Sequence, residues 1–388
     1  MKMQVYFDNA ATSYPKPEEV YQAVEHFMRE IGVSSGRGAY RKALEADRII
    51  YEARKSLAEL FNVSDTKRIV FASNATEALN LAMKGILSEG DHVITSQMEH
   101  NAVWRPLKRL ESERGVEITQ IPCLSDGSLE DPEQVRAAIK SNTKLVVMIH
   151  ASNVVGTIMP IEEIGKICTE NGVLLLVDTA QTAGALPIDV EAMGIDLLAF
   201  TGHKGLLGLQ GTGGLYIREG VQLGTLKEGG TGSESDRETQ PDELPDRYEA
   251  GTHNALGLAG LRAGVQFILS QGVQKIRDRE SELTAYLLDR LRGMDAIQIY
   301  GSQDPEKQVG VVSINIAHHR PEDIGYALDA VYGVMVRTGL HCSPCAHRTI
   351  GTIDRGTLRI SLGYFNTEAE IDHTVQALSQ IMRRSGRK

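Results

Sequence analysis

Short apolar runs alternate with segments of helical period between about residues 67 and 217. Several runs are apolar on both faces, which is typical of strands in a parallel sheet that helices cover on both sides. Helix-length segments such as 75–87 and 161–171 separate the runs. The pattern predicts an α/β domain. The apolar runs lie at 68–71, 92–95, 116–119, 145–149, 174–178, 197–200 and 214–217.

The alternation stops at residues 229–252, which are rich in Gly, Ser, Asp, Glu and Pro and predict a long loop. A helical stretch is predicted from about 255 to 293. The remaining residues mix short apolar runs with helical segments, which predicts a smaller α+β domain. We expect a large domain at 15–260 and a small domain formed by 1–14 and 261–388.

The composition is that of a globular protein, with 41% hydrophobic and 24% charged residues among 388. The formal net charge of -10 argues against direct nucleic-acid binding, which normally needs a basic surface. The chain has no apolar run of about 18 residues, so we expect no membrane span. The first residues lack the apolar core of a signal peptide, and we expect a cytoplasmic protein.

Four cysteines are present, and in a reducing compartment we expect them to be free thiols. Cys342 and Cys345 are separated by two residues, and no second cysteine pair exists to complete a zinc site. We therefore expect no bound metal.

Asp178 and Lys204 each follow an apolar run, which predicts that both lie at the carboxyl edge of the sheet, where α/β proteins bind ligands. A pyridine cofactor between them would satisfy both, because the carboxylate can hold a protonated ring nitrogen and the lysine can form an imine with the cofactor's aldehyde. A structural ion pair is the alternative.

Residues 73–77 come directly after the first apolar run and open a predicted helix. The free N–H groups of that first turn, together with the side chains of Ser73 and Thr76, can hold a phosphate. Simple capping of the helix by Ser73 or Asn74 is the alternative.

Three polar residues also follow predicted strands: His100, Asn153 and Gln181. The flat imidazole could stack on a flat cofactor ring, and the two amides could bond its phenolic oxygen or the substrate. Each could equally be satisfying the backbone of its own loop.

The segment 337–345 reads as a polar loop that carries Cys342 beside His341 and near Arg337. Positive neighbours lower the pKa of a thiol and favour a nucleophilic thiolate, whereas many free cysteines are simply small buried hydrophobes. Arg359, in a later predicted strand, could clamp a substrate carboxylate with two hydrogen bonds or form a surface ion pair.

These residues together resemble the cysteine desulfurases of the NifS/SufS kind, a family of class V aminotransferase-fold enzymes. The resemblance runs nearly end to end, and the ordered set of motifs is far more specific than any one of them. The motifs begin at Phe7-Asp8-Asn9-Ala10-Ala11-Thr12 and continue with 73–77, His100, Asn153, Asp178 with Gln181, Thr201-Gly202-His203-Lys204, Glu249-Ala250-Gly251-Thr252, the Cys342 loop and Arg359.

The resemblance implies fold type I, with a large domain built on a mainly parallel seven-stranded sheet, a smaller α+β domain, and pyridoxal 5'-phosphate as the cofactor. Lys204 would hold the cofactor and shuttle protons, and Cys342 would take sulfur from L-cysteine as a persulfide, releasing L-alanine. His100 would stack on the ring and Asp178 would hold its nitrogen. The other cofactor contacts implied are Ala75, Thr76, Asn153, Gln181, Thr201, His203 and Thr252, and the substrate contacts are Asn9, Asn153 and Arg359.

The resemblance also implies a homodimer, because Thr252 in such enzymes typically reaches the phosphate of the other subunit. The sulfur would pass to an acceptor protein or thiol, in iron–sulfur cluster assembly or another pathway. Leu340 and Cys345 depart from the family pattern, and the second thiol could relay sulfur, form a transient disulfide or do nothing. The short loop implies that the acceptor must come to the site.

Other functions fit parts of the same pattern. A selenocysteine lyase would use the same lysine, arginine and cysteine. A lyase or aminotransferase of this fold would not need Cys342. A non-catalytic sulfur carrier or scaffold would need no cofactor at all.

Overall fold

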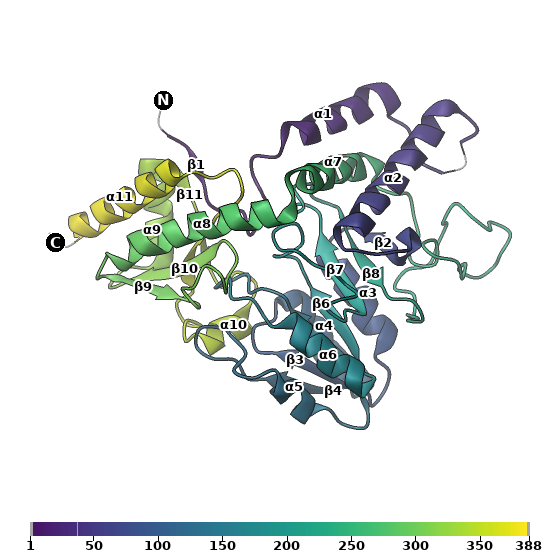
Figure 1. Cartoon of the computed structure of the whole chain (residues 1–388), viewed down its shortest axis with the longest axis horizontal. Coiled ribbons are helices and arrows are strands. Elements are labelled where there is room, and N and C mark those ends of the chain that lie inside the picture. The colour runs from purple at the N-terminus through teal and green to yellow at the C-terminus, as the bar shows by residue number, and fades with distance from the viewer. Residues whose placement is uncertain (1–2, 37, 386–388) are drawn as a thin grey trace.

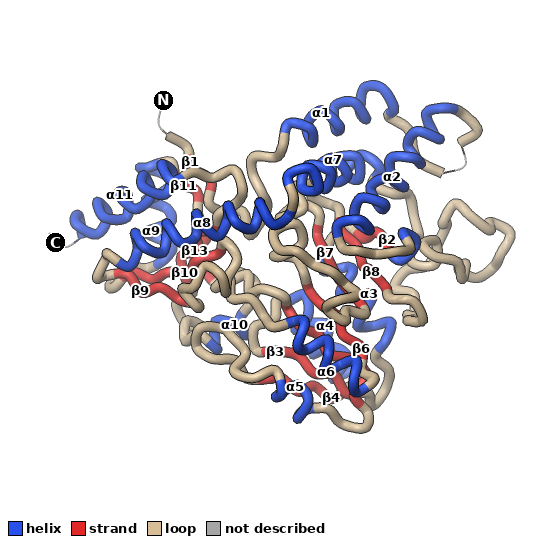
Figure 2. Tube along the Cα trace, in the orientation of Figure 1, coloured by secondary structure: helices blue, strands red, loops and turns tan. Residues whose placement is uncertain are grey.

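A computed structural model describes residues 3–36 and 38–385 of the chain. A seven-stranded sheet forms the larger part, and a four-stranded sheet with its helices forms the smaller part (Figures 1 and 2). This confirms the predicted architecture. None of the helices in the described ranges combines the length and hydropathy needed to cross a membrane.

The large sheet has the strand order β2-β8-β7-β6-β5-β3-β4. Strand β8 runs antiparallel to both of its neighbours, and the other strands are parallel. The strands are β2 (Ile69–Ala72), β3 (His92–Ser96), β4 (Glu117–Ile121), β5 (Thr143–Ile149), β6 (Leu174–Asp178), β7 (Leu197–Thr201) and β8 (Gly213–Ile217).

Helices cover both faces of this sheet because its strands carry apolar residues on both sides. In β5, Leu145 and Val147 pack in the cluster that contains α3 and α4, whereas Val146 and Met148 pack in the cluster that contains α2, α6 and α7. The helices of this part are α1 (Glu18–His26), α2 (Arg41–Leu60), α3 (Ala75–Ile86), α4 (Asn101–Arg114), α5 (Glu133–Ala138), α6 (Ile161–Asn171) and α7 (Ala255–Gln271), with a π-helical turn, η1 (Phe27–Ile31), and a short 3-10 turn, η2 (Thr66–Arg68).

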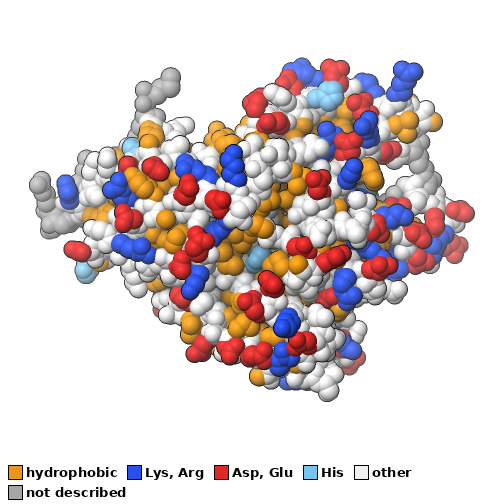
Figure 3. Space-filling view, viewed as in Figure 1, with side chains coloured by type: hydrophobic (Ala, Val, Ile, Leu, Met, Phe, Trp, Pro, Cys, Tyr) orange, Lys and Arg blue, Asp and Glu red, His pale blue; other side chains and the backbone are white. Residues whose placement is uncertain are grey.

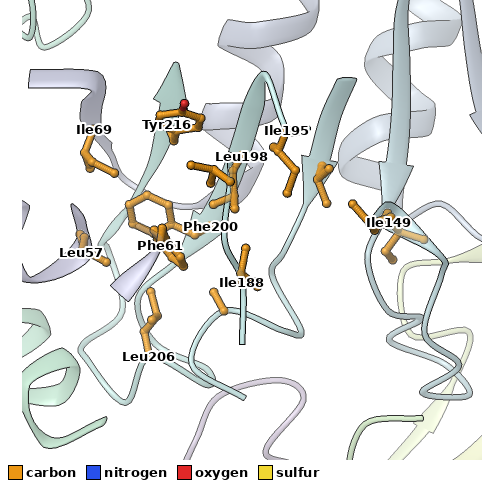
Figure 4. Packing of buried hydrophobic residues seen from close by; sticks show 14 of the residues in the cluster. Leu57, Phe61, Ile69, Ile149, Ile188, Ile195, Leu198, Phe200, Leu206 and Tyr216 are labelled. Atoms are coloured by element: carbon orange, nitrogen blue, oxygen red, sulfur yellow. The ribbon is translucent and has the colours of Figure 1, made fainter. Parts of the chain in front are cut away.

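The core on the α2 side is aromatic at its centre (Figure 4). The ring of Phe61, just after α2, lies 5.6 Å from the ring of Phe200 in β7, measured between ring centroids. Leu198 and Leu206 lie on either side of this pair in the same cluster. Because β7 leads directly into Lys204, this packing fixes the end of the strand that presents the lysine.

The four-stranded sheet is antiparallel and has the order β12-β13-β10-β9. A two-stranded parallel pairing joins β1 to β11, so the N-terminal segment lies against the C-terminal part of the chain. The elements are β1 (Val5–Tyr6), α8 (Val273–Arg292), β9 (Ile297–Tyr300), β10 (Val311–Ile316), α9 (Pro321–Ala327), a π-helical turn η3 (Leu328–Tyr332), β11 (Val334–Met335), β12 (Arg337–Gly339), α10 (Pro344–Thr349), β13 (Thr357–Ser361) and α11 (Glu368–Ser385).

The predicted helical stretch at 255–293 is two helices, because Gly272 has a φ of +84° and ends α7 before α8 begins. The predicted loop is confirmed: the chain from 218 to 254 is described throughout and contains no helix or strand. The domain limits at 15–260 and 1–14 with 261–388 stay a prediction; residue 260 falls inside α7.

Candidate active site

A cavity lies at the carboxyl ends of β3, β5, β6 and β7, beside the start of α3. It brings together every predicted cofactor contact except Thr252. Its lining residues are Asn74, Ala75, Thr76, His100, Ala102, Ile149, Asn153, Asp178, Ala180, Gln181, Thr201, His203 and Lys204.

The start of α3 forms one end of the cavity. Asn74 caps the helix by accepting the Glu77 N–H at 3.0 Å, so the capping alternative holds for this residue. The N–H groups of Ala75 and Thr76 lie in the first turn, where the helix itself offers no acceptor. Gly213 lets β8 approach this turn, since an added Cβ would lie 2.7 Å from the Cα of Asn74. The turn is therefore free to receive an anion.

Asp178 and Lys204 are two opposite charges in the wall of this cavity, and within the described structure no salt bridge joins them. The Asp178 carboxylate is buried and accepts the Ala180 N–H at 2.9 Å. Burial raises the pKa of Asp178, and the Ala180 N–H and Lys204 oppose that rise. Burial lowers the pKa of Lys204 to about 8, although Asp178 opposes this too. Charges held apart in this way fit a polar ligand between them.

His100 is held as a neutral ring. It precedes α4, and its Nδ1 accepts the Ala102 N–H at 3.0 Å. Burial, followed by the positive charges of Lys204 and Arg337, lowers the pKa of His100 to about 4. Because Nδ1 accepts, we assign the proton of the neutral ring to Nε2.

The next polar groups are His203 and Gln181. Burial and Lys204 lower the pKa of His203 to about 4, and its buried Nδ1 has no partner in the described structure. The Gln181 side chain donates to the Ala10 carbonyl at 3.1 Å. Thr201 is buried, and its hydroxyl makes only a long contact of 3.5 Å, to the Thr212 carbonyl. These side chains can therefore form further hydrogen bonds to a ligand, most clearly at the His203 nitrogen, which has no partner among the described residues.

Arg359 is buried, with 1% of its side chain exposed, and is not a surface residue. One terminal nitrogen donates to the Asp8 carboxylate at 2.7 Å and the other to the Asn153 carbonyl at 2.9 Å. Its Nε has no partner in the described part of the chain. A guanidinium fixed on two sides with a spare buried N–H can receive a carboxylate.

Asn153 lines the cavity, but its side chain serves the Cys342 loop. Its Nδ2 donates to the His341 carbonyl at 2.7 Å, and its Oδ1 accepts the Ser343 hydroxyl at 2.7 Å. The alternative that this amide satisfies loop backbone is therefore met in the structure. A direct contact of Asn153 with cofactor or substrate stays a prediction.

Cys342 is exposed, whereas Cys345 is buried. An Arg337 terminal nitrogen lies 3.9 Å from the Cys342 sulfur. Burial raises the pKa of Cys345, although Arg348 opposes that rise. The two thiols therefore differ in access, and Cys342 is the one open to a reaction partner.

Four predicted residues do not line the cavity: Arg359 and Cys342, described above, and Asn9 and Thr252. Asn9 lines a neighbouring cavity that shares Lys204 and Gln181 with the first. Its amide is bonded to Ser361 O at 3.0 Å and to Asn366 at 3.1 Å. Thr252 is exposed and lies in a surface hollow beside Ser73 and Lys227.

The sequence pattern missed the residues that hydrogen-bond to the site residues or to the strand ends beside them. Asp8 lies in the opening motif, but no spacing links it to Arg359, 351 positions away. The sequence pattern did not single out Ser343 or Glu99 either. The position of Glu99, directly before His100 and just after a predicted strand, was the only sequence signal, and its full burial is visible only in the structure.

The family model described as aminotransferase class-V matches residues 5–374. The chain is 36% identical to a probable cysteine desulfurase of Methanothermobacter thermautotrophicus, covering 98% of this chain and 95% of that protein. It is 33% identical to a cysteine desulfurase of Salmonella agona, covering 98% and 94%.

Solved structures agree. An apo cysteine desulfurase from Thermococcus onnurineus superposes with a TM-score of 0.92 at 32% identity, covering 98% of this chain and 95% of that chain. The cysteine desulfurase CsdA from Escherichia coli gives 0.87 at 26% identity, with coverage of 98% and 95%. The match to the family model spans nearly the whole chain, and so the chain belongs to the class-V aminotransferase family.

Proposed function

We propose that this protein is a cysteine desulfurase that uses pyridoxal 5'-phosphate to convert L-cysteine to L-alanine and a persulfide on Cys342. The observation that carries the proposal is a cavity with Lys204 and Asp178 in its wall. Asn153, which also lines the cavity, is hydrogen-bonded to the loop of the exposed Cys342 and to the buried Arg359. The full-length likeness to cysteine desulfurases supports it.

The cavity fits the cofactor. The first turn of α3 with Ala75 and Thr76, together with Thr201 and the unpartnered His203, would hold the phosphate. His100 offers a neutral ring for stacking, and Asp178 a carboxylate for the pyridine nitrogen. When bound, the cofactor supplies an aldehyde that captures amines and a ring that withdraws electrons.

The residues of this chain then have separate tasks. Arg359 would bind the carboxylate of cysteine through its spare N–H groups. Lys204, with its pKa lowered to about 8, would carry a proton on Nζ near neutral pH and could also give it up. The Cys342 thiolate would form a bond to the substrate sulfur while the substrate's C–S bond breaks. That electron pair stays on carbon, and a proton completes the methyl group of alanine.

We further propose a homodimer in which Thr252 reaches the partner's cofactor phosphate. Glu249 fixes the segment that carries Thr252, since it accepts two hydrogen bonds from Arg54, at 2.7 and 2.9 Å, and one from the Phe71 N–H at 2.6 Å. The exposed apolar side chains of α1 and α2 suit burial between subunits; they are Tyr21, Met28 (in η1), Leu44 and Tyr51.

The persulfide would pass to an acceptor protein or thiol, since Cys342 is exposed. We propose a cytoplasmic enzyme that contributes to iron–sulfur cluster assembly and does not bind nucleic acid directly. Acidic and basic side chains are interspersed over the face seen in Figure 3, which fits a protein partner better than a polyanion. The proposed division is a large domain at 15–260 and a small domain at 1–14 with 261–388.

The test combines a visible spectrum with product analysis. A purified yellow protein that makes alanine and, with a reductant, sulfide from cysteine is the expected result. A yellow protein that makes alanine equally well as Cys342→Ala would indicate a lyase or aminotransferase instead. A protein that cannot be loaded with the cofactor would contradict the proposal, and rates on selenocysteine would separate it from a selenocysteine lyase.

A further inference from the structure

The loop that carries Cys342 has its backbone tied down at three consecutive carbonyl groups. The Leu340 carbonyl accepts the Ser343 N–H at 2.9 Å. The His341 carbonyl accepts Asn153 Nδ2 at 2.7 Å. The Cys342 carbonyl accepts the Asn101 N–H, in the first turn of α4, at 2.9 Å. Two of these bonds therefore fasten the nucleophile loop to the large part of the molecule, through Asn153 and Asn101, and the third closes a turn within the loop.

The loop needs this fastening because its conformation is unfavourable. His341 has a φ of 49° and Cys342 a φ of 61°. Side chains other than glycine rarely adopt the left-handed region, and two in succession persist only when surrounding contacts hold them. Loss of one such contact should let the loop relax toward ordinary φ values and move the thiol.

Ser343 is the least expected member of this set. It precedes α10, the position where a serine hydroxyl normally accepts an N–H of the helix, yet it makes no such bond. It is fully buried, and its hydroxyl instead donates to Asn153 Oδ1 at 2.7 Å. The His341 carbonyl can only accept, so it requires Nδ2 on its side, and the Ser343 hydroxyl holds the other end of the same amide by donating to Oδ1.

The same asparagine also meets the buried arginine, because its backbone carbonyl accepts Arg359 NH1 at 2.9 Å. Asn153 thus supports two parts of the site: its side chain, which Ser343 holds, supports the thiol loop, and its backbone carbonyl supports the arginine.

We propose that Ser343 is a positioning residue for Cys342: through the amide of Asn153 it holds the loop in the conformation that presents the thiol to the substrate. The proposal rests on the desulfurase function given above. Its consequence is that the hydroxyl of Ser343 matters for sulfur transfer and not for cofactor or cysteine binding.

The test compares Ser343→Ala with Ser281→Ala, which removes another buried hydroxyl that contacts Pro305 O at 3.2 Å far along the chain from the loop. In Ser343→Ala we expect kcat for alanine formation to fall about tenfold, because small displacements of a reacting group are costly. The KM for cysteine should stay within about threefold and the chromophore should be unchanged. Ser281→Ala should leave kcat unchanged.

Hydrogen exchange supplies a readout that does not depend on activity. The peptide that covers residues 338–343 should exchange at least about fivefold faster in Ser343→Ala and also in Asn153→Asp, which keeps the acceptor for Ser343 but loses the donor to His341 O. The second variant keeps the proposal testable if Ser343→Ala folds poorly.

Unchanged exchange in both variants, or a Ser343→Ala enzyme whose kcat is within twofold of the parent, would overturn the positioning role. A parent enzyme that makes no alanine from cysteine would instead contradict the proposed function. The hydrogen-exchange result would still show whether Ser343 and Asn153 hold the Cys342 loop.

Discussion

The two sides of the candidate site differ in how their charged groups are held. On the large-sheet side, Asp178 and Lys204 lie in the cavity wall, and among the described residues no salt bridge joins them and a buried nitrogen of His203 has no partner. On the other side, Arg359 and the Cys342 loop are held by hydrogen bonds from within the chain, although Arg359 Nε and His341 Nδ1 have no partner among the described residues. The charges of the first side are not paired with each other, whereas the Arg359 charge of the second side is already paired with Asp8 and held in place to act on a ligand.

The difference has an energetic meaning. Buried polar groups without partners cost free energy in the ligand-free protein, and a bound ligand returns that cost as affinity. Groups that are already paired lose little when the ligand leaves. We therefore expect changes on the large-sheet side to affect loading of the protein, and changes on the other side to affect turnover of the loaded protein.

Lys204→Ala should have the largest effect, because it removes the central charged group of the large-sheet side. Loss of the amine removes both the attachment of the cofactor and the proton carrier, so alanine formation should fall at least about 10³-fold. The visible chromophore should disappear or shift, as an absorption spectrum would show. The exposed Lys144 is a matched control, and Lys144→Ala should keep colour and rate. A Lys204→Ala protein with the parent's spectrum would contradict the assignment.

Cys342→Ala against Cys345→Ala tests the other side. The exposed thiol should be required, with a loss of about 10²-fold or more in alanine formation and an unchanged chromophore. The buried thiol has a raised pKa and should change the rate by less than about threefold. Equal losses in the two variants would mean that Cys345 takes part in sulfur relay.

The sequence pattern placed Asp178 and Lys204 at one edge of the sheet, but it did not reveal the contacts that hold Arg359 and the Cys342 loop. Asp178 and Lys204 each follow an apolar strand, and strand ends of a parallel sheet converge on one edge, so local pattern was enough. Arg359 meets Asp8 across 351 positions, and Asn153 meets Ser343 across 190. No periodicity encodes such pairings. The break at Gly272 was missed for a related reason, since glycine inside an apolar helical pattern is tolerated and its φ depends on tertiary packing.

Arg359→Lys should weaken the binding of cysteine without loss of the cofactor, and so separate the two sides of the site more sharply. Lysine keeps the charge but loses the planar fork, so the KM for cysteine should rise about 30-fold while the chromophore remains. Arg277→Lys is the control, because that buried arginine donates to the carbonyls of residues 305, 306 and 308, which lie outside the candidate site. It should cost stability and leave KM unchanged. A KM for Arg359→Lys within twofold of the parent would remove Arg359 from the substrate site.

Glu99→Gln should have the smallest effect, visible only as pH dependence of stability. Glu99 directly precedes His100, and its Oε1 accepts both the Ser96 hydroxyl at 2.7 Å and the Ile149 N–H at 3.0 Å. Its Oε2 is buried without a partner in the described structure. Burial raises the pKa of Glu99 from 4.5 to about 8. Near neutral pH the side chain is therefore mainly protonated in the folded protein and ionised in the unfolded chain.

The folded state thus binds more protons than the unfolded state between about pH 4.5 and pH 8, so the stabilisation is full below that window and is lost as pH rises through it. Glutamine mimics the protonated acid and does not titrate. Between pH 6 and pH 7 the free energy of unfolding of the parent should fall by about 1 kcal/mol more than that of Glu99→Gln, in urea titrations of the cofactor-free proteins. Glu280, whose pKa burial also raises to about 8, is present in both proteins and cancels. If the free energies of unfolding of the two proteins changed with pH in parallel, Glu99 would be ionised in the folded state. The large-sheet side would then hold a buried carboxylate charge that we do not infer.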